Sequence, residues 1–93
     1  AALETPRFEF ALHSVTPNPA RGPFRVDLSL EGSAPATLEL VDIAGRRVTA
    51  RAVGDLGAGR HQVDVREGLP AGVYLVRLTS GGRVRVMKAV VLR

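Results

Sequence analysis

Hydrophobic and polar residues alternate with a period of two along most of the chain. The clearest run is residues 24–30, where Phe24, Val26, Leu28 and Leu30 alternate with polar side chains. Successive side chains of a β-strand point to opposite faces of a sheet, so this pattern predicts strands with one buried face and one exposed face. No stretch shows the period of about 3.6 residues that marks an amphipathic helix.

Six further runs share this alternation: residues 8–12, 36–43, 47–50, 60–65, 73–78 and 83–92. Segments rich in glycine and proline separate them, at the spacing of roughly 8–12 residues that is typical of β-sandwiches. No connection has room for a crossover helix. The pattern therefore predicts an all-β antiparallel sandwich of about seven strands, with Leu28 and Leu40 in its core.

The register of the last run is open. Val84 and Val86 share a parity with Lys88, which does not suit a buried face. Either a β-bulge shifts the register, or the lysine lies at a rim of the sandwich.

Composition bounds the class of protein. The 93 residues make one domain, which we place at residues 9–93 after a linker remnant at residues 1–8. Without cysteine the chain has no disulfides and no thiolate metal ligands. No apolar run reaches the length of about 18 residues of a membrane-spanning helix. We expect no cofactor and no membrane insertion.

The formal net charge is +4, and twelve of the thirteen basic residues are arginine. Such a bias can mark a nucleic-acid-binding surface. However, Arg25, Arg77, Arg83 and Arg85 alternate with apolar residues, as solvent-facing strand positions do. The four aromatic residues offer little stacking surface for bases. We expect no nucleic-acid partner.

The segment PNPARG, residues 17–22, predicts a rigid corner. Pro17 and Pro19 fix their own φ angles and keep the preceding residues out of the helical region. Gly22 allows a positive φ before Pro23. We expect this corner to end one strand and to start the next across the sandwich.

Two more motifs predict turns. In DIAGR, Asp42 is expected to cap backbone amides and Gly45 to take the left-handed conformation. The spacing of carboxylates in a calcium loop is missing there. In LPAGVY, Gly72 is expected in strained backbone, and Tyr74 resembles the tyrosine corner of sandwich domains, whose hydroxyl bonds back to the chain.

The sequence offers few candidate catalytic residues. His13 and His61 are the only histidines, and alternation places His13 outward and His61 inward near a strand end. Asp27 and Asp64 fall on the polar faces of their strands. Because no nucleophile, base and orienting group are brought together, we expect no catalytic site and no enzymatic activity.

These motifs carry a family resemblance. PNPARG, LELVDIAGRRV, LGAGRHQVDV, LPAGVYLVRLTSGG and a basic, valine-rich last strand follow one another in that order. The order resembles the C-terminal sorting domains of type IX secretion cargo, and a related pattern occurs in the immunoglobulin-like domain of the flagellar hook-assembly scaffold. The positions that match are Pro17, Asn18, Pro19, Gly22, Asp42, Gly45, Arg46, Gly59, Leu69, Gly72 and Tyr74.

The resemblance implies a fold and a function. The fold would be an immunoglobulin-like sandwich. The domain would be a monomeric part of a larger secreted protein of a Gram-negative-type bacterium. The type IX machinery would recognise it after export to the periplasm and carry the cargo across the outer membrane to the cell surface, and a sortase-like peptidase would remove the domain. The alternative is a permanent structural or binding module of a surface protein.

The last strand is the expected recognition surface. Arg83, Arg85, Lys88 and Arg93 form a basic stretch, and no acidic residue comes after Glu67. If this strand lies at a sheet edge, a partner strand can pair with it.

Overall fold

The computed structural model describes residues 9–92, which form seven β-strands and one short 3₁₀ helix. The elements in order are β1 (Ala11–Thr16), β2 (Phe24–Leu30), β3 (Thr37–Asp42), β4 (Arg47–Ala52), η1 (Gly54–Leu56), β5 (Gly59–Val65), β6 (Gly72–Ser80) and β7 (Arg83–Val91). The predicted all-β class and the seven strands are confirmed. Residues 1–8, which we assigned to a linker, and Arg93 lie outside the described part.

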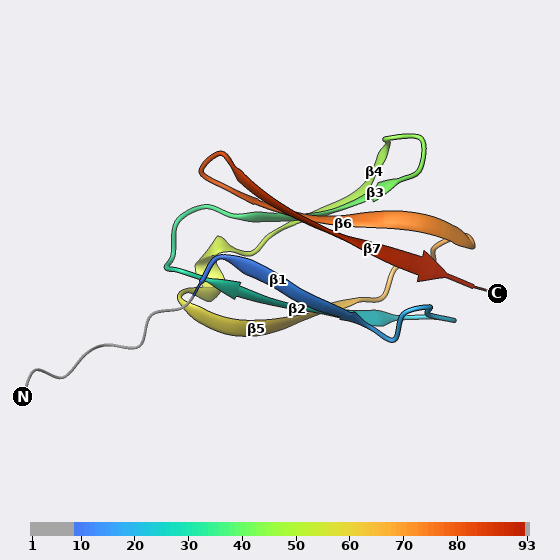
Figure 1. Ribbon diagram of the computed structural model, residues 1–93, viewed down its shortest axis with the longest axis horizontal. Helices are drawn as coiled ribbons and strands as arrows, with labels where there is room; N and C mark the ends of the chain where they lie inside the picture. Colours follow the sequence, from blue (N-terminus) through green and yellow to red (C-terminus); the bar gives the residue numbers. More distant parts are fainter. Residues whose placement is uncertain (1–8, 93) are drawn as a thin grey trace, which may run out of the picture.

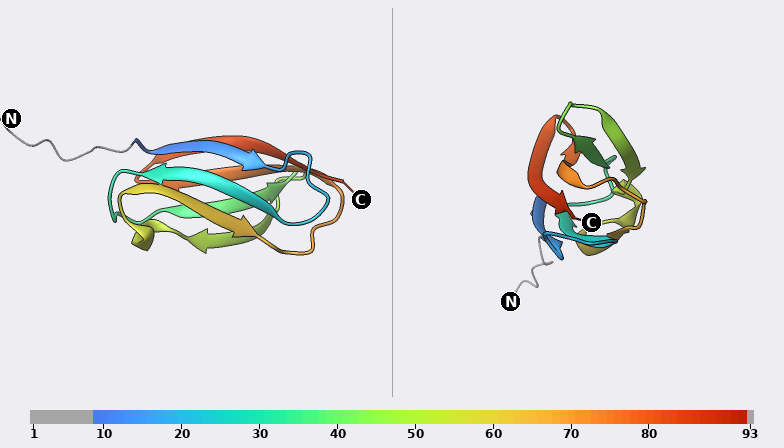
Figure 2. Two further views of the ribbon diagram at one scale, coloured as in Figure 1. Left: turned by 90° about the horizontal axis from the view of Figure 1, so that it is seen from below. Right: turned by 90° about the vertical axis from the view of Figure 1, so that its right-hand side faces the viewer.

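The strands form two antiparallel sheets that face each other (Figure 1). One sheet has the order β1-β2-β5 and the other has the order β4-β3-β6-β7. Figure 2 shows the three-stranded sheet from outside in its left panel and looks along the sandwich in its right panel. The predicted antiparallel sandwich is therefore confirmed.

The core lies between the two sheets and obeys the predicted alternation. Val26 and Leu28 from β2 and Val76 and Leu78 from β6 are each at most 1% exposed, and Leu40 is 2% exposed. Their polar neighbours in sequence point to the opposite face because side chains alternate along a strand. Alternation alone thus identified the inward residues of β2, β3 and β6.

Two irregularities interrupt the ladders. Between β1 and β2 the register shifts between Leu12 and Ser14, with His13 at the shift. In the β3–β4 ladder, the register shifts after Leu40. Leu40 is paired with Thr49, and Val41 is paired with Arg47. A β-bulge inserts an unpaired residue and so reverses the parity of the inward side chains beyond it. Val15 is therefore buried although its parity differs from that of Phe10.

The corner at residues 17–22 does not cross the sandwich as predicted. It joins β1 to β2, which are neighbours in one sheet. Gly22 is not among the glycines with positive φ, so that prediction is also wrong. The segment instead reaches the other sheet from the side, through a parallel bridge between Ala20 and Val91.

The last strand matches neither alternative that the sequence left open. The β6–β7 ladder runs from Ser80 paired with Arg83 to Gly72 paired with Val91, without a register shift. Lys88 lies opposite Leu75, well within the strand. The inward residues of β7 are Met87, Ala89 and Val91, and Val84 and Val86 face outward with the lysine. The valine parity had suggested the wrong buried face.

The helix η1 is the only helical element of the described chain, and no helix there is long and apolar enough to cross a membrane.

Truncating the predicted core leucines should destabilise the sandwich. We expect Leu28→Ala and Leu40→Ala each to cost about 2–5 kcal/mol, because each removes buried contacts and leaves a cavity. The free energy of unfolding is measured by urea titration. Ile43→Ala is the control: this side chain is 85% exposed, and its loss should change stability by less than about 0.5 kcal/mol. Unchanged midpoints for both leucine variants would contradict the assigned core.

Candidate functional site

The corner at residues 17–22 closes the edge of the last strand. The Asn18 side-chain amide donates to the Lys88 carbonyl at 2.9 Å, and its oxygen accepts from the Val90 amide at 3.0 Å. Ala20, which is fully buried, donates to the Val90 carbonyl at 2.8 Å and accepts from the Leu92 amide at 2.7 Å. The corner therefore takes the place of a partner strand for the end of β7. Pro17 and Pro19 flank Asn18, and the Thr16–Pro17 and Asn18–Pro19 peptide bonds are both cis.

The β3–β4 turn is held together by one carboxylate. Oδ1 of Asp42 accepts from the backbone amides of Ala44 at 3.0 Å and Arg46 at 2.8 Å. Oδ2 accepts from Nε of Arg46 at 2.9 Å. Gly45 has a φ of 86°, in the left-handed region. Both predictions for this turn are confirmed, and Ile43 projects from it almost fully exposed.

The loop before β6 contains the predicted tyrosine corner. The hydroxyl of Tyr74 donates to the Pro70 carbonyl at 2.6 Å, and the side chain is 5% exposed. Leu69 packs against the core from the same loop. Gly72 has a φ of 158°, at the boundary between extended backbone and the region that favours glycine, and its Cβ position meets only the Tyr74 ring at 4.0 Å. Any cost of a side chain at Gly72 therefore comes from the backbone angle and not from a clash.

These three segments lie together at one end of the sandwich, beside the end of β7 (Figure 1). β1, β3, β5 and β7 end here, so the corner, the 42–46 turn and the 66–71 loop are at the same end of the sandwich. A groove of about 500 Å³ runs between the turn and the loop, lined in part by Ile43, Val48 and Val73. Gly59 is the exception among the motif positions. It begins β5 at the opposite end, with a φ of 126°.

The four basic residues of the expected recognition surface do not form one patch. Arg83 and Arg85 have the inward parity of β7, and their guanidinium groups lie 4.7 Å and 5.2 Å from the centre of the Phe10 ring. Arg83 also pairs with Glu31. Lys88 points to the outer face, and Arg93 is outside the described residues. Two of the four side chains thus cover the first aromatic residue of the core.

One comparison with known proteins identifies the family. The family described as a secretion system C-terminal sorting domain matches residues 14–92. The chain belongs to this family. Comparison with curated proteins finds no match. The match begins in β1 and ends just after β7, so it includes the corner, the turn and the tyrosine loop described above.

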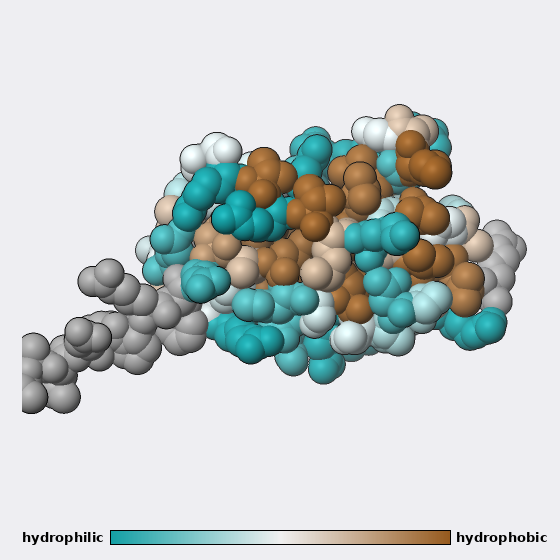
Figure 3. Space-filling view, viewed as in Figure 1, coloured by the Kyte–Doolittle hydropathy of each residue, from teal (hydrophilic) through white to brown (hydrophobic). Residues whose placement is uncertain are grey.

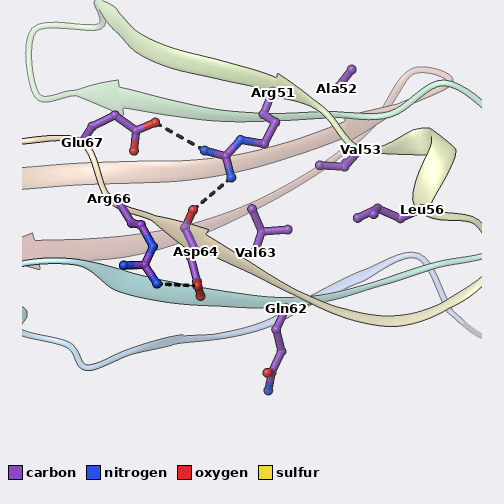
Figure 4. Close-up of a pocket in the computed structure, with 9 residues that line it drawn as sticks. All are labelled: Arg51, Ala52, Val53, Leu56, Gln62, Val63, Asp64, Arg66 and Glu67. Carbon is purple, nitrogen blue, oxygen red and sulfur yellow. Dashed lines mark hydrogen bonds and ion pairs between the residues drawn. The ribbon is translucent and has the colours of Figure 1, made fainter.

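Another groove of the sorting domain lies between β4 and β5 and has a volume of about 650 Å³ (Figure 4). Arg51 spans it, donating to the Asp64 carbonyl at 2.9 Å and to Glu67 at 3.4 Å. Asp64 also pairs with Arg25 and Arg66. These contacts hold the edges of the two sheets together. Asp64 and Glu67 are the carboxylates that line the groove, and both are paired with arginines.

The histidines of the sorting domain have local partners. Nε2 of His13 lies 2.9 Å from the Ser29 hydroxyl, which donates to the Glu9 carbonyl at 2.6 Å. Nε2 of His61 lies 2.8 Å from the Gly57 carbonyl. As predicted, His13 is exposed and His61 points inward at a strand end. Among residues 9–92 no cluster of three or more histidine or carboxylate side chains is placed to hold a metal ion.

Four carboxylates have pKa values below their usual range. In each case the largest cause is a hydrogen bond donated by an arginine: Arg60 to Asp27, Arg77 to Glu39, the backbone amide of Arg46 to Asp42, and Arg25 to Asp64. These groups remain ionised at neutral pH. They are therefore suited to ion pairing and not to donating a proton.

Stability should fall in acid. A carboxyl group whose pKa is lower in the folded than in the unfolded state stabilises the fold above the unfolded pKa, near about 4. This contribution disappears as the pH falls through the folded pKa. We expect urea midpoints that are constant from about pH 6 to 8 and that decrease below about pH 4. Glu39→Gln should weaken the decrease. Midpoints that stay constant down to about pH 2 would contradict this account of the ion pairs.

Replacing Gly45 should strain the turn. We expect Gly45→Val to destabilise the domain by more than the gain of about 0.4–1 kcal/mol from a stiffer unfolded chain, since a β-branched residue disfavours positive φ. Gly45→Asn, which tolerates this conformation, is the matched control and should lose less. Equal urea midpoints for the valine variant and the parent chain would contradict the argument.

Proposed function

We propose that this domain directs a secreted cargo protein through the type IX secretion system to the cell surface. Membership of the sorting-domain family carries this proposal. The domain acts by being recognised and catalyses nothing itself. Its partners are the type IX machinery and a sortase-like peptidase, and it is covalently part of a larger protein.

The arrangement of the motifs supports recognition of the folded domain. Residues of three segments that are distant in sequence meet at one end of the sandwich, where β7 ends. The described chain begins at the other end, where Glu9 accepts a hydrogen bond from Ser29. A cargo joined before Glu9 would leave the motif end accessible to the machinery.

The first half of β7 offers a backbone edge. β7 is the last strand of its sheet, and the even-numbered residues Lys88, Val90 and Leu92 bond to the corner, away from β6. By the alternation of an antiparallel ladder, the amide and carbonyl of Val86 point the same way. The corner does not extend this far along β7. We infer that a strand of the machinery pairs with the strand at residues 84–88.

Export of a reporter tests this function. The domain is fused to a fluorescent cargo with a signal peptide in a host that has a type IX system, and surface fluorescence is measured. Deletion of residues 84–93 should leave the cargo in the periplasm. Because this deletion also removes Ala89 and Val91 from the core, a milder variant is needed.

Val86→Pro removes the outward amide and also replaces the valine side chain, and proline is tolerated at an edge position whose N–H does not bond within the sheet. It should reduce surface fluorescence by roughly five- to thirtyfold if strand pairing supplies about 1–2 kcal/mol. Val86→Ile, which keeps the amide, should export normally, and Pro19→Ala should reduce export only as far as it reduces folding. Normal export of a folded Val86→Pro variant would exclude the edge. If the intact fusion never reaches the surface, the sorting function is wrong and a permanent module takes its place.

A further inference from the structure

The two outer faces of the sandwich differ in chemistry. Over β1, β2 and β5, the outer face is polar and its charges are paired: Arg25 bonds to Asp64 at 3.1 Å, and Arg60 bonds to Asp27 at 3.0 Å. This is what a solvated sheet face requires, because only one face of the sheet packs on the core.

The outer face of the four-stranded sheet is apolar. Val73 and Leu75 on β6 and Val84 and Val86 on β7 point away from the core and are between 38% and 52% exposed. They are contiguous because Val73 lies opposite Val90, and Leu75 is diagonal to Val86 and Val90. Figure 3 shows this hydrophobic surface over β6 and β7. We name these five residues, Val90 included, the apolar face.

The apolar face adds nothing to the core of the domain. The opposite parity of β6, with Tyr74, Val76 and Leu78, already fills the space between the sheets. Exposed apolar side chains that are contiguous and bordered by polar residues mark interaction surfaces. The groove lined by Ile43, Val48 and Val73 continues the face toward the motif end.

The charges around the apolar face are mostly positive. Glu39 is the only carboxylate on this side of β3, β4, β6 and β7, and its side chain is 11% exposed. Arg77 and Arg47 bond to it at 3.2 Å and 3.5 Å. Lys88 stands opposite Leu75 and is exposed. This side of the sheet thus carries three cations, two of them paired with Glu39, and one carboxylate, so the complementary surface is acidic.

The positive charge around the apolar face argues against two other partners, a second copy of the domain and a membrane surface. A second copy packed face to face would bring the cations of both copies together, which costs free energy. A membrane surface would attract the cations, but tryptophan and tyrosine are the residues enriched at membrane interfaces, and the apolar face has neither.

We propose that the apolar face docks a protein surface in which an apolar strip is bordered by Asp or Glu side chains. The inference rests on the proposed sorting function, in that the partner is a component met during export. It differs from the strand pairing at the edge of β7, since it uses the side chains of β6, which is not an edge strand.

The reporter fusion tests the apolar face. The variant Val73→Thr/Leu75→Thr makes the outer face of β6 more polar, and threonine is β-branched and suits a strand. We expect its surface fluorescence to fall by roughly tenfold, which corresponds to losing about 1.4 kcal/mol of binding, with an unchanged urea midpoint. Lys88→Glu should also reduce export, and Lys88→Arg should not. The matched control on the polar face, Ser14→Thr/Gln62→Thr, should export normally.

The outcomes separate this inference from the sorting function. If the parent fusion is not exported, the sorting function fails. If the parent and the β6 variant are exported equally, the docking inference alone is wrong. If the β6 variant has a lower urea midpoint, the Lys88→Glu variant decides the outcome instead, because Lys88 is exposed and its replacement should leave the stability unchanged. Normal export of the Lys88→Glu variant would contradict the proposal that the partner surface is acidic.

Cross-linking identifies the chemistry of the partner. A photoreactive residue at position 75, with position 62 as the control, should attach in cells to a segment that contains both apolar and acidic residues. A segment without Asp or Glu overturns the proposal. Sedimentation of the purified domain as a dimer that the β6 variant dissociates, or its binding to phosphatidylglycerol vesicles that this variant abolishes, also overturns it.

Discussion

The sandwich depends on the closure of its last strand by the corner at residues 17–22. Each sheet is held by its own ladders, but the two sheets otherwise meet through side chains. Asn18 and Ala20 supply four hydrogen bonds to the backbone of β7, across 70 or more residues of sequence. An unpaired strand edge would be open to any other chain. The corner covers the end of β7, where Ala89 and Val91 point into the core.

This closure is partial, and the partial closure gives β7 two different halves. The second half is capped by side-chain and backbone groups of the corner, and it packs inward. The first half has a backbone edge with which no strand pairs, outward valines, and two arginines that cover the Phe10 ring. The same strand thus completes the core and presents the surfaces to which we assign recognition.

Charge pairing is used differently on the two sides of the molecule. Over the three-stranded sheet, arginines and aspartates pair across neighbouring strands and leave a solvated surface. Between β4 and β5, Arg51 links the edges of the two sheets. Over the four-stranded sheet, Glu39 holds two arginines close to the sheet among apolar side chains. Exposed pairs of this kind add little stability individually, so their main effect here is on the character of each surface.

The sequence by itself determined the strands, the inner faces of the strands that alternate clearly, and the local turns. Alternation placed Leu28 and Leu40 in the core because a strand has a period of two. The chemistry of Asp42, Gly45 and Tyr74 acts over four residues or fewer, so it is readable without the fold. The family motifs were also recognisable, because their order survives in the chain.

The tertiary structure decided what depends on neighbours distant in sequence. It placed the corner against β7 instead of across the sandwich, because hydrogen bonds to Lys88 and Val90 hold Asn18 there. The alternation in β7 did not indicate which of its two faces is buried, since both faces carry apolar residues. The ladder to β6 made that choice, and it turned Val84, Val86 and Lys88 outward together. The apolar face exists only because of that register, which no local pattern encodes.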